Sequence, residues 1–151
     1  MTAHDTMPEI ASVRPEMTAA IAAQTGLDEV ILHDLVHCFY AKARADPVLG
    51  PVFAARIHDW GPHLDRMVGF WSSVALMTGR YHGAPVPAHA TLPVNGAHFD
   101  RWLDLFRETA REVCPPEGAA HVIARAERIA RSLQMAVEDC ARASTVAPSL
   151  R

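Results

Sequence analysis

Hydrophobic positions along the chain recur at helical spacing in four long segments. The clearest series is Leu27, Ile31, Leu35 and Phe39, which repeats every four residues until Asp46-Pro47 ends it. Three more helices are expected, from Asp59 to about residue 78, from His98 to Cys114 and from about Glu117 to Arg142, with a short one over Glu16–Gln24 before them. Because no segment alternates with a period of two residues, the pattern predicts an all-α fold.

The boundaries of these helices carry recognisable signals. Thr25 with Asp28 has the T-x-x-D spacing of a capping box, and Gly79 is the residue type that commonly ends a helix. Residues 49–53 predict a tight corner anchored by Phe53. Residues 79–96 hold three prolines and several glycines without a period, so a long irregular loop is expected there. Such loops inside compact helical domains are commonly functional.

The length and the charge limit the classes of protein to consider. With 151 residues, of which 50% are hydrophobic, the chain is expected to form one domain over residues 16–143, with flexible segments at 1–15 and 144–151. A net charge of -3 supplies no overall basic field, so no nucleic-acid partner is expected.

The N-terminus and the cysteines predict a cytoplasmic protein. Asp5 and Glu9 stand where a signal peptide needs a basic end, and no apolar run is long enough to span a membrane. Cys38, Cys114 and Cys140 form no C-x-x-C pair and are expected to be buried thiols. No membrane partner is therefore expected.

Several chemical motifs are absent or weak. Without strands, the sequence offers no support for a Rossmann fold, a P-loop or a nucleophile elbow. The pairs Glu29–His33 and Glu117–His121 have i+4 spacing, which is not the Glu-x-x-His of di-iron bundles. His33 and His37 have the spacing of a metal pair but no third ligand nearby, so a solvated helix face is the favoured interpretation.

Two other histidines stand in more suggestive places. His63 falls on an aromatic-rich apolar stripe, and His89 lies within the proline-rich loop. Tyr40 on the preceding helix and Trp102 on the following one are both expected to face inward. Singly, each histidine is more commonly structural. Together, the four residues suit a flat apolar cofactor held between helices, with its metal ligated on one side.

Six segments, taken in order, resemble the group III truncated haemoglobins. They are FYAKARADPVLGPVF (39–53), WGPH (60–63), FWSS (70–73), TGRYHGAP (78–85), HATLP (89–93) and HFDRWLDLF (98–106). The resemblance covers about residues 27–142 and implies a shortened globin fold, in which two antiparallel helix pairs sandwich haem b.

The resemblance also implies a role for individual residues. His89 matches the iron ligand of the family, and Tyr40, His63 and Trp102 match the residues on the opposite, ligand-binding side. Phe53 and Met67 match positions that line the pocket. From the residues themselves, Phe70, Leu92 and Phe99 are expected to exclude water with Met67, and Arg66 is expected at the rim, within reach of an anionic haem propionate.

These residues and the resemblance together predict a haem protein that binds diatomic ligands (O2, NO, CO) at a pentacoordinate iron. An NO dioxygenase or peroxidase-like activity is a further option, which would require an external reductase. The alternative from another class is a small helical DNA-binding or interaction module without a cofactor. Arg66 has an equally simple interpretation as a solvated helix residue, and Trp60 and Trp71 are expected in the core.

Overall fold

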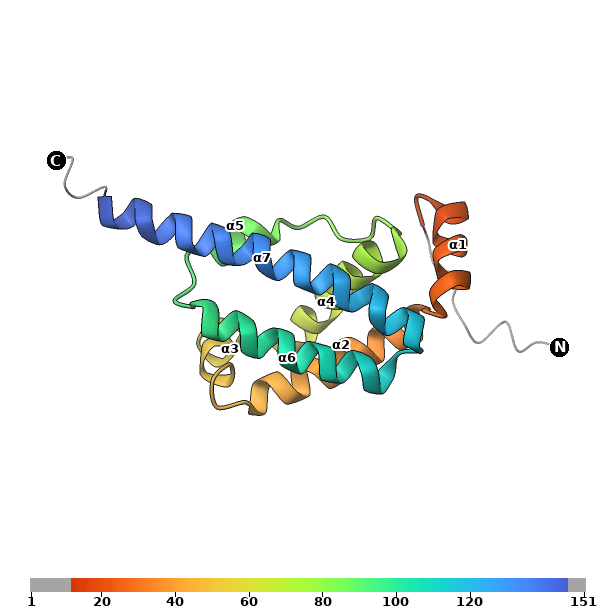
Figure 1. Ribbon diagram of the computed structural model, residues 1–151, viewed down its shortest axis with the longest axis horizontal. Coiled ribbons are helices and arrows are strands. Elements are labelled where there is room, and N and C mark those ends of the chain that lie inside the picture. Colours follow the sequence, from red (N-terminus) through yellow and green to blue (C-terminus); the bar gives the residue numbers. More distant parts are fainter. Residues whose placement is uncertain (1–11, 147–151) are drawn as a thin grey trace.

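The computed structural model describes residues 12–146, and within this range every regular element is a helix (Figure 1). The helices are α1 (Pro15–Thr25), α2 (Glu29–Ala45), α3 (Gly50–Arg56), α4 (Trp60–Leu76), α5 (Pro85–Ala90), α6 (Gly96–Val113) and α7 (Pro116–Val146). The predicted all-α class is thus confirmed. Most of the two predicted flexible ends, namely residues 1–11 and 147–151, lies outside the described residues.

The two longest helices form one layer of the molecule. α6 and α7 run side by side in opposite directions along the long axis in Figure 1, joined by the short turn at Cys114-Pro115. α2 packs against both α4 and α6, and α5 packs against α7. The chain therefore brings α4 and α5, which are separated by a loop, into contact with the same long helix.

A single hydrophobic core joins α2, α4, α6 and α7. It is built from the apolar stripes that the helical spacing predicts, with Leu35 and Phe39 of α2 and Phe106 of α6 almost completely buried. Trp71 of α4 stacks on Phe106 with ring centroids 4.8 Å apart, and Trp102 also stacks on Phe106, at 5.4 Å. This stack fixes α6 against α4 and sets the position of Trp102.

Two helix boundaries differ from the sequence-based expectation. Thr25 ends α1 and does not cap α2: its hydroxyl donates to the carbonyl of Ile21 and accepts from the N–H of Leu27. Asp28 caps α2 alone, accepting from the N–H of Ile31. At the end of α4, Met77 adopts the left-handed conformation expected of Gly79, which also has a positive φ but lies two residues later.

Both predicted irregular segments contain a helix. The expected corner at residues 49–53 is part of α3, because the Asp46 carboxylate accepts from the N–H groups of Val48 and Leu49 and turns the chain directly into that helix. The expected loop at 79–96 contains α5, where Pro85 takes the first helical position that suits proline. A prediction from glycine and proline content alone missed both short helices.

The segment before α2 closes the end of α4. Thr18 donates to the carbonyl of Leu76, Arg14 to that of Met77, and the N–H of Val13 to that of Thr78. These bonds satisfy carbonyls that the end of a helix leaves without partners. Val13 and Arg14, which belong to the predicted flexible lead-in, are thus hydrogen-bonded to the residues that follow α4.

The hydropathy of the helices and the burial of the cysteines bear on two further expectations. None of the helices described over residues 12–146 is both long and apolar enough to cross a membrane. The expectation of three buried thiols was wrong, because Cys38 is exposed and Cys140 is half-buried. Only Cys114 is buried, and burial raises the pKa of its thiol to about 11. All three are free thiols.

Candidate functional site

Four aromatic rings from three helices form a cluster at the start of α4. We call Tyr40, Phe53, Trp60 and His63 the ring cluster. The Tyr40 ring lies 5.6 Å from Phe53, 5.6 Å from Trp60 and 5.2 Å from His63, measured between ring centroids. Trp60 and His63 lie on the same face of α4 because they are three residues apart, and their centroids are 5.4 Å apart. Tyr40 is thus the centre of the cluster.

The His63 side chain carries a buried atom without a partner. Its Nε2 is inaccessible to solvent and makes no hydrogen bond with any described residue. Burial lowers the pKa of the imidazole, and the nearby positive charge of Arg66 lowers it further. A buried polar atom without a partner is costly, and this cost would be removed if a bound group contacted the atom or if the ring turned toward solvent.

Tyr40 and Trp102 hold two more donors that are not used within the protein. Neither the Tyr40 hydroxyl nor the Trp102 indole N–H has a hydrogen-bond partner among residues 12–146. Burial alone raises the pKa of the Tyr40 hydroxyl, so it keeps its proton and remains a donor. Phe39 bridges the two side chains, with centroids 5.0 Å from Tyr40 and 5.5 Å from Trp102.

His89 is oriented by a local hydrogen bond within α5. Its Nδ1 lies 2.6 Å from the carbonyl oxygen of Pro85, one helical turn earlier. Because a carbonyl only accepts, Nδ1 carries the proton and donates, which leaves Nε2 with its lone pair. The ring is half-buried. A neutral histidine held in this way has the form that commonly binds a metal ion.

The residues expected to line and border the site are distributed around it. Met67 and Phe70 pack partly buried against the core, and Leu92 and Phe99 are half-buried. No ring contact joins Phe99 to the ring cluster within the described range. Arg66 is exposed and lines an open pocket of about 360 Å³ between α4 and the following loop.

That pocket is lined by charged and polar side chains from α4 and from the following loop. Its wall includes Arg66 of α4 and Arg80, Tyr81 and His82 of the loop, with Asp65 as its acidic member. Arg80 is held by Glu29 at 2.5 Å, and Glu29 also accepts from Ser72. No role was predicted for residues 80–82, because their proximity to Arg66 depends on how the loop folds back over α4.

A second, apolar pocket of about 260 Å³ lies where α4, α5 and α7 meet. Phe70, Val74, Ile129 and Leu133 contribute apolar side chains, and Pro85 forms the α5 side. Arg125 and Arg128 of α7 also line it.

The other histidines have simpler surroundings. The rings of His33 and His37 stack 3.9 Å apart on the outside of α2, and His33 is exposed. Over the described range no group of three or more potential ligands could hold a metal ion. The solvated-face interpretation therefore remains the simpler one. His98 accepts from the N–H of Asn95 and so caps the start of α6.

Sequence reasoning missed the part played by Trp60 and Arg44. Trp60 was expected in the core, whereas it is half-buried and touches both Tyr40 and His63. The Arg44 guanidinium lies over the Trp60 ring, 4.3 Å from its centroid. The spacings that place them, three residues before His63 and four after Tyr40, were visible in the sequence. Their contact with each other was not.

Comparison with known proteins places this helical bundle among the globins. No family model matches the chain. The group 3 truncated hemoglobin ctb of Campylobacter jejuni is 34% identical over 105 residues, which is 66% of this chain and 83% of that protein. The crystal structure of the group III truncated hemoglobin from Campylobacter jejuni superposes with a TM-score of 0.69 at 32% identity, covering 74% of this chain and 91% of that one.

These similarities identify the family. The protein has the fold of a truncated globin, a class of haem protein. Within that class, the chain belongs to the group III truncated haemoglobins, because its match exceeds 30% identity over most of the relative's length. The expected family and fold class are confirmed.

Proposed function

We propose that this protein binds haem b beside the ring cluster, with His89 as the iron ligand, and binds diatomic gases (O2, NO, CO) on the opposite side. The observation that carries the proposal is the Nε2 atom of His63, which is buried and has no partner within the protein. Tyr40, in ring contact with His63, holds a second unused polar group. Unused polar groups that gather in an apolar cluster suit a small polar ligand.

The residues of the site fit the haem that the family implies. When bound, haem would supply an iron atom that a histidine of the protein could ligate and that could bind a small molecule. His89 offers an Nε2 lone pair, and its Nδ1 bond to the Pro85 carbonyl fixes the tautomer and the ring direction. This bond also increases the basicity of the ligating nitrogen.

Tyr40 and Trp102 are proposed to hold the gas ligand by hydrogen bonds. Each brings an unused donor from a different helix, and each is fixed by ring contacts with Phe39. A donor that is already oriented needs little reorganisation when it meets a ligand with partial negative charge. Dioxygen should therefore be retained more strongly than carbon monoxide, which develops little such charge.

The remaining residues are proposed to exclude water and to hold the rim. Phe53, Met67, Phe70, Leu92 and Phe99 supply apolar surface, and every one of them is at least half-buried. Arg66 is proposed to pair with a haem propionate, because it is exposed on α4 and lines an open pocket beside the loop that follows this helix.

NO dioxygenase or peroxidase-like chemistry remains a prediction and is not part of this proposal. Such a reaction would need electrons from an external reductase, since residues 12–146 contain no strand and hence no nucleotide-binding sheet. We place gas binding and any such partner in the cytoplasm. The family assignment favours a haem protein over a helical module without a cofactor.

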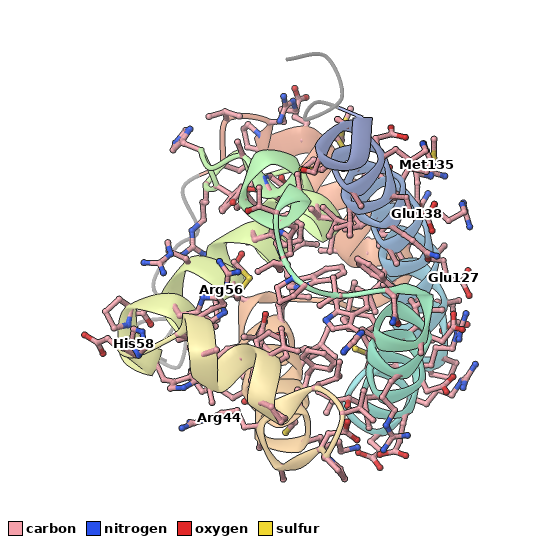
Figure 2. All side chains as sticks on the ribbon, turned by 90° about the vertical axis from the view of Figure 1, so that its left-hand side faces the viewer. Arg44, Arg56, His58, Glu127, Met135 and Glu138 are labelled. Atoms are coloured by element: carbon pink, nitrogen blue, oxygen red, sulfur yellow. The ribbon has the colours of Figure 1, made fainter. Side chains whose placement is uncertain are left out.

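The proposal is tested by adding haem to the purified full chain and recording its absorption spectrum. We expect a Soret band typical of a histidine-ligated haem, and we expect His89→Ala to lose it on gel filtration. His58→Ala is a matched control, because His58 is exposed in the connection between α3 and α4 (Figure 2). A chain that retains no haem would contradict the proposal. Unchanged retention in His89→Ala would place the ligand elsewhere.

A further inference from the structure

The Trp60 ring contacts two polar aromatic residues, Tyr40 and His63, and also a cationic side chain, Arg44. On one side, its ring meets Tyr40 at 5.6 Å and His63 at 5.4 Å, the latter with the planes nearly perpendicular at 88°. On the other side, the guanidinium of Arg44 lies 4.3 Å from the ring centroid. Trp60 thus contacts both the exposed Arg44 and two polar residues of the proposed ligand site.

The Arg44 guanidinium lies over the face of the Trp60 ring. Arg44 is exposed in the last turn of α2 and forms no ion pair with any carboxylate of residues 12–146. Figure 2 shows it on the same side of the molecule as Arg56 and His58, away from Glu127, Met135 and Glu138 on α7. A guanidinium over the face of tryptophan is attracted by the negative face of the ring, and this attraction favours the orientation of the indole that the structure shows.

Two aromatic neighbours contact the His63 ring. Tyr40 and Trp60 both contact it with nearly perpendicular ring planes, at 84° and 88°. No hydrogen bond to its Nε2 fixes the side chain. If Trp60 moved away, the imidazole would lose one of these two ring contacts.

We propose that Arg44 and Trp60 form a latch that holds the His63 ring over the ligand site and so sets how readily a gas molecule enters. Trp60 is a positioning residue, and Arg44 holds it in place from the surface. This inference rests on the proposed function, since it assigns the control of ligand access at the same site.

The latch is tested by carbon monoxide association and dissociation rates in the haem-loaded full chain. Arg44→Gln should raise the association rate by about two- to fivefold, the factor that corresponds to one exposed cation–π contact. Trp60→Leu should raise it by about five- to tenfold, since two ring contacts are lost. Dissociation should change less in both variants. Arg44→Lys and Trp60→Phe should restore most of the parent rate.

A double substitution shows whether the effect passes through His63. In a His63→Leu background, Arg44→Gln should no longer change the association rate, because the ring that the latch holds is gone. Arg56→Gln is the matched control: it removes the same charge from the end of α3, and the rate should stay at the parent value. An equal effect of Arg44→Gln with and without His63 would overturn the proposal.

A second measurement does not depend on haem. In the full chain without added haem, NMR signals of the His63 ring should report one ordered environment, assigned by their loss in His63→Leu. We expect Arg44→Gln to shift them toward the averaged position of an exposed histidine, and Arg56→Gln to leave them in place. Unchanged signals in Arg44→Gln would overturn the latch, whereas failure to take up haem would overturn only the proposed function.

Discussion

The two sides of the proposed haem site are held in different ways. On the His63 side, rings from α2, α3 and α4 contact each other, and Trp102 joins them through Phe39. On the His89 side, one helix of six residues presents the histidine. Of the α5 side chains that the structure describes, none is fully buried, and a single bond to Pro85 orients the ring.

The side chains on the two sides of the proposed site are therefore oriented by different means. Tertiary packing orients the donors of the ring cluster, because contacts from several helices restrict each side chain. Local backbone geometry orients His89, because its partner lies one turn away in the same helix. Substitutions on the His89 side should therefore affect whether haem is retained, and those on the other side how a gas ligand enters and leaves.

The largest effect is expected from His89→Ala. Since α5 offers no second ligand in the same position, stable haem retention should be lost, or the iron should change its ligand. Absorption spectra before and after gel filtration measure this. A normal spectrum with full retention would contradict the assignment and direct attention to His63 or His98.

The next largest effects are expected from Tyr40→Phe and Trp102→Phe. A hydrogen bond to a partly charged acceptor is worth about 1.5–3 kcal/mol. By the rule of about 1.4 kcal/mol per tenfold, each variant should release dioxygen about 10- to 100-fold faster in stopped-flow experiments. Carbon monoxide dissociation should stay within a few-fold of the parent, which serves as the internal control.

Because both donors address one ligand, their effects on dioxygen release should not be additive in a double-mutant cycle. If both single variants release dioxygen at the parent rate, Tyr40 and Trp102 are packing residues and the assignment of donors fails.

His63→Leu distinguishes a gate from a donor. The contacts with Tyr40 and Trp60 favour a gate, so the association rate should rise by about tenfold, as expected where the open position is a minor state. Dissociation should change less. The opposite result, a faster dissociation rate with little change in the association rate, would show that the imidazole stabilises the bound ligand as a hydrogen-bond donor.

The smallest effect on ligand rates is expected from Asp46→Asn, which instead tests how α2, α3 and α6 are held together. The Asp46 carboxylate is buried and accepts from the N–H groups of Leu49 and Val48 and from Arg101 of α6. Burial by itself would raise the pKa of this carboxyl, but these donors outweigh it and lower the pKa.

The sign of the pH dependence follows from that lowered pKa. The stabilisation is present above the ordinary carboxyl pKa of about 4 and is lost as the pH falls through the lower value of the folded protein. Asp46→Asn should therefore lower the melting temperature at pH 7 and flatten its fall in acid, while haem retention through His89 persists. An unchanged acid profile would show that other carboxylates dominate.

Much of the fold was predictable because it depends on local sequence. The stripe from Leu27 to Phe39 predicted α2, and Pro115-Pro116 correctly separated α6 from α7. The resemblance to group III truncated haemoglobins drew attention to His89, and its bond to Pro85 is itself local, four residues apart. By contrast, α3 and α5 were missed because the turn and the packing that stabilise them outweigh their content of glycine and proline.

The order of residues along the chain was enough to specify the long helices, the family and the residue types available for the proposed haem site. It took the folded arrangement to show that Nε2 of His63 is buried without a partner, that Arg44 lies over Trp60 and that Arg80 and Tyr81 join Arg66 around one pocket. The physical reason is that periodicity specifies which face of a helix is buried. Which side chains then meet depends on the packing of helices that are distant along the chain.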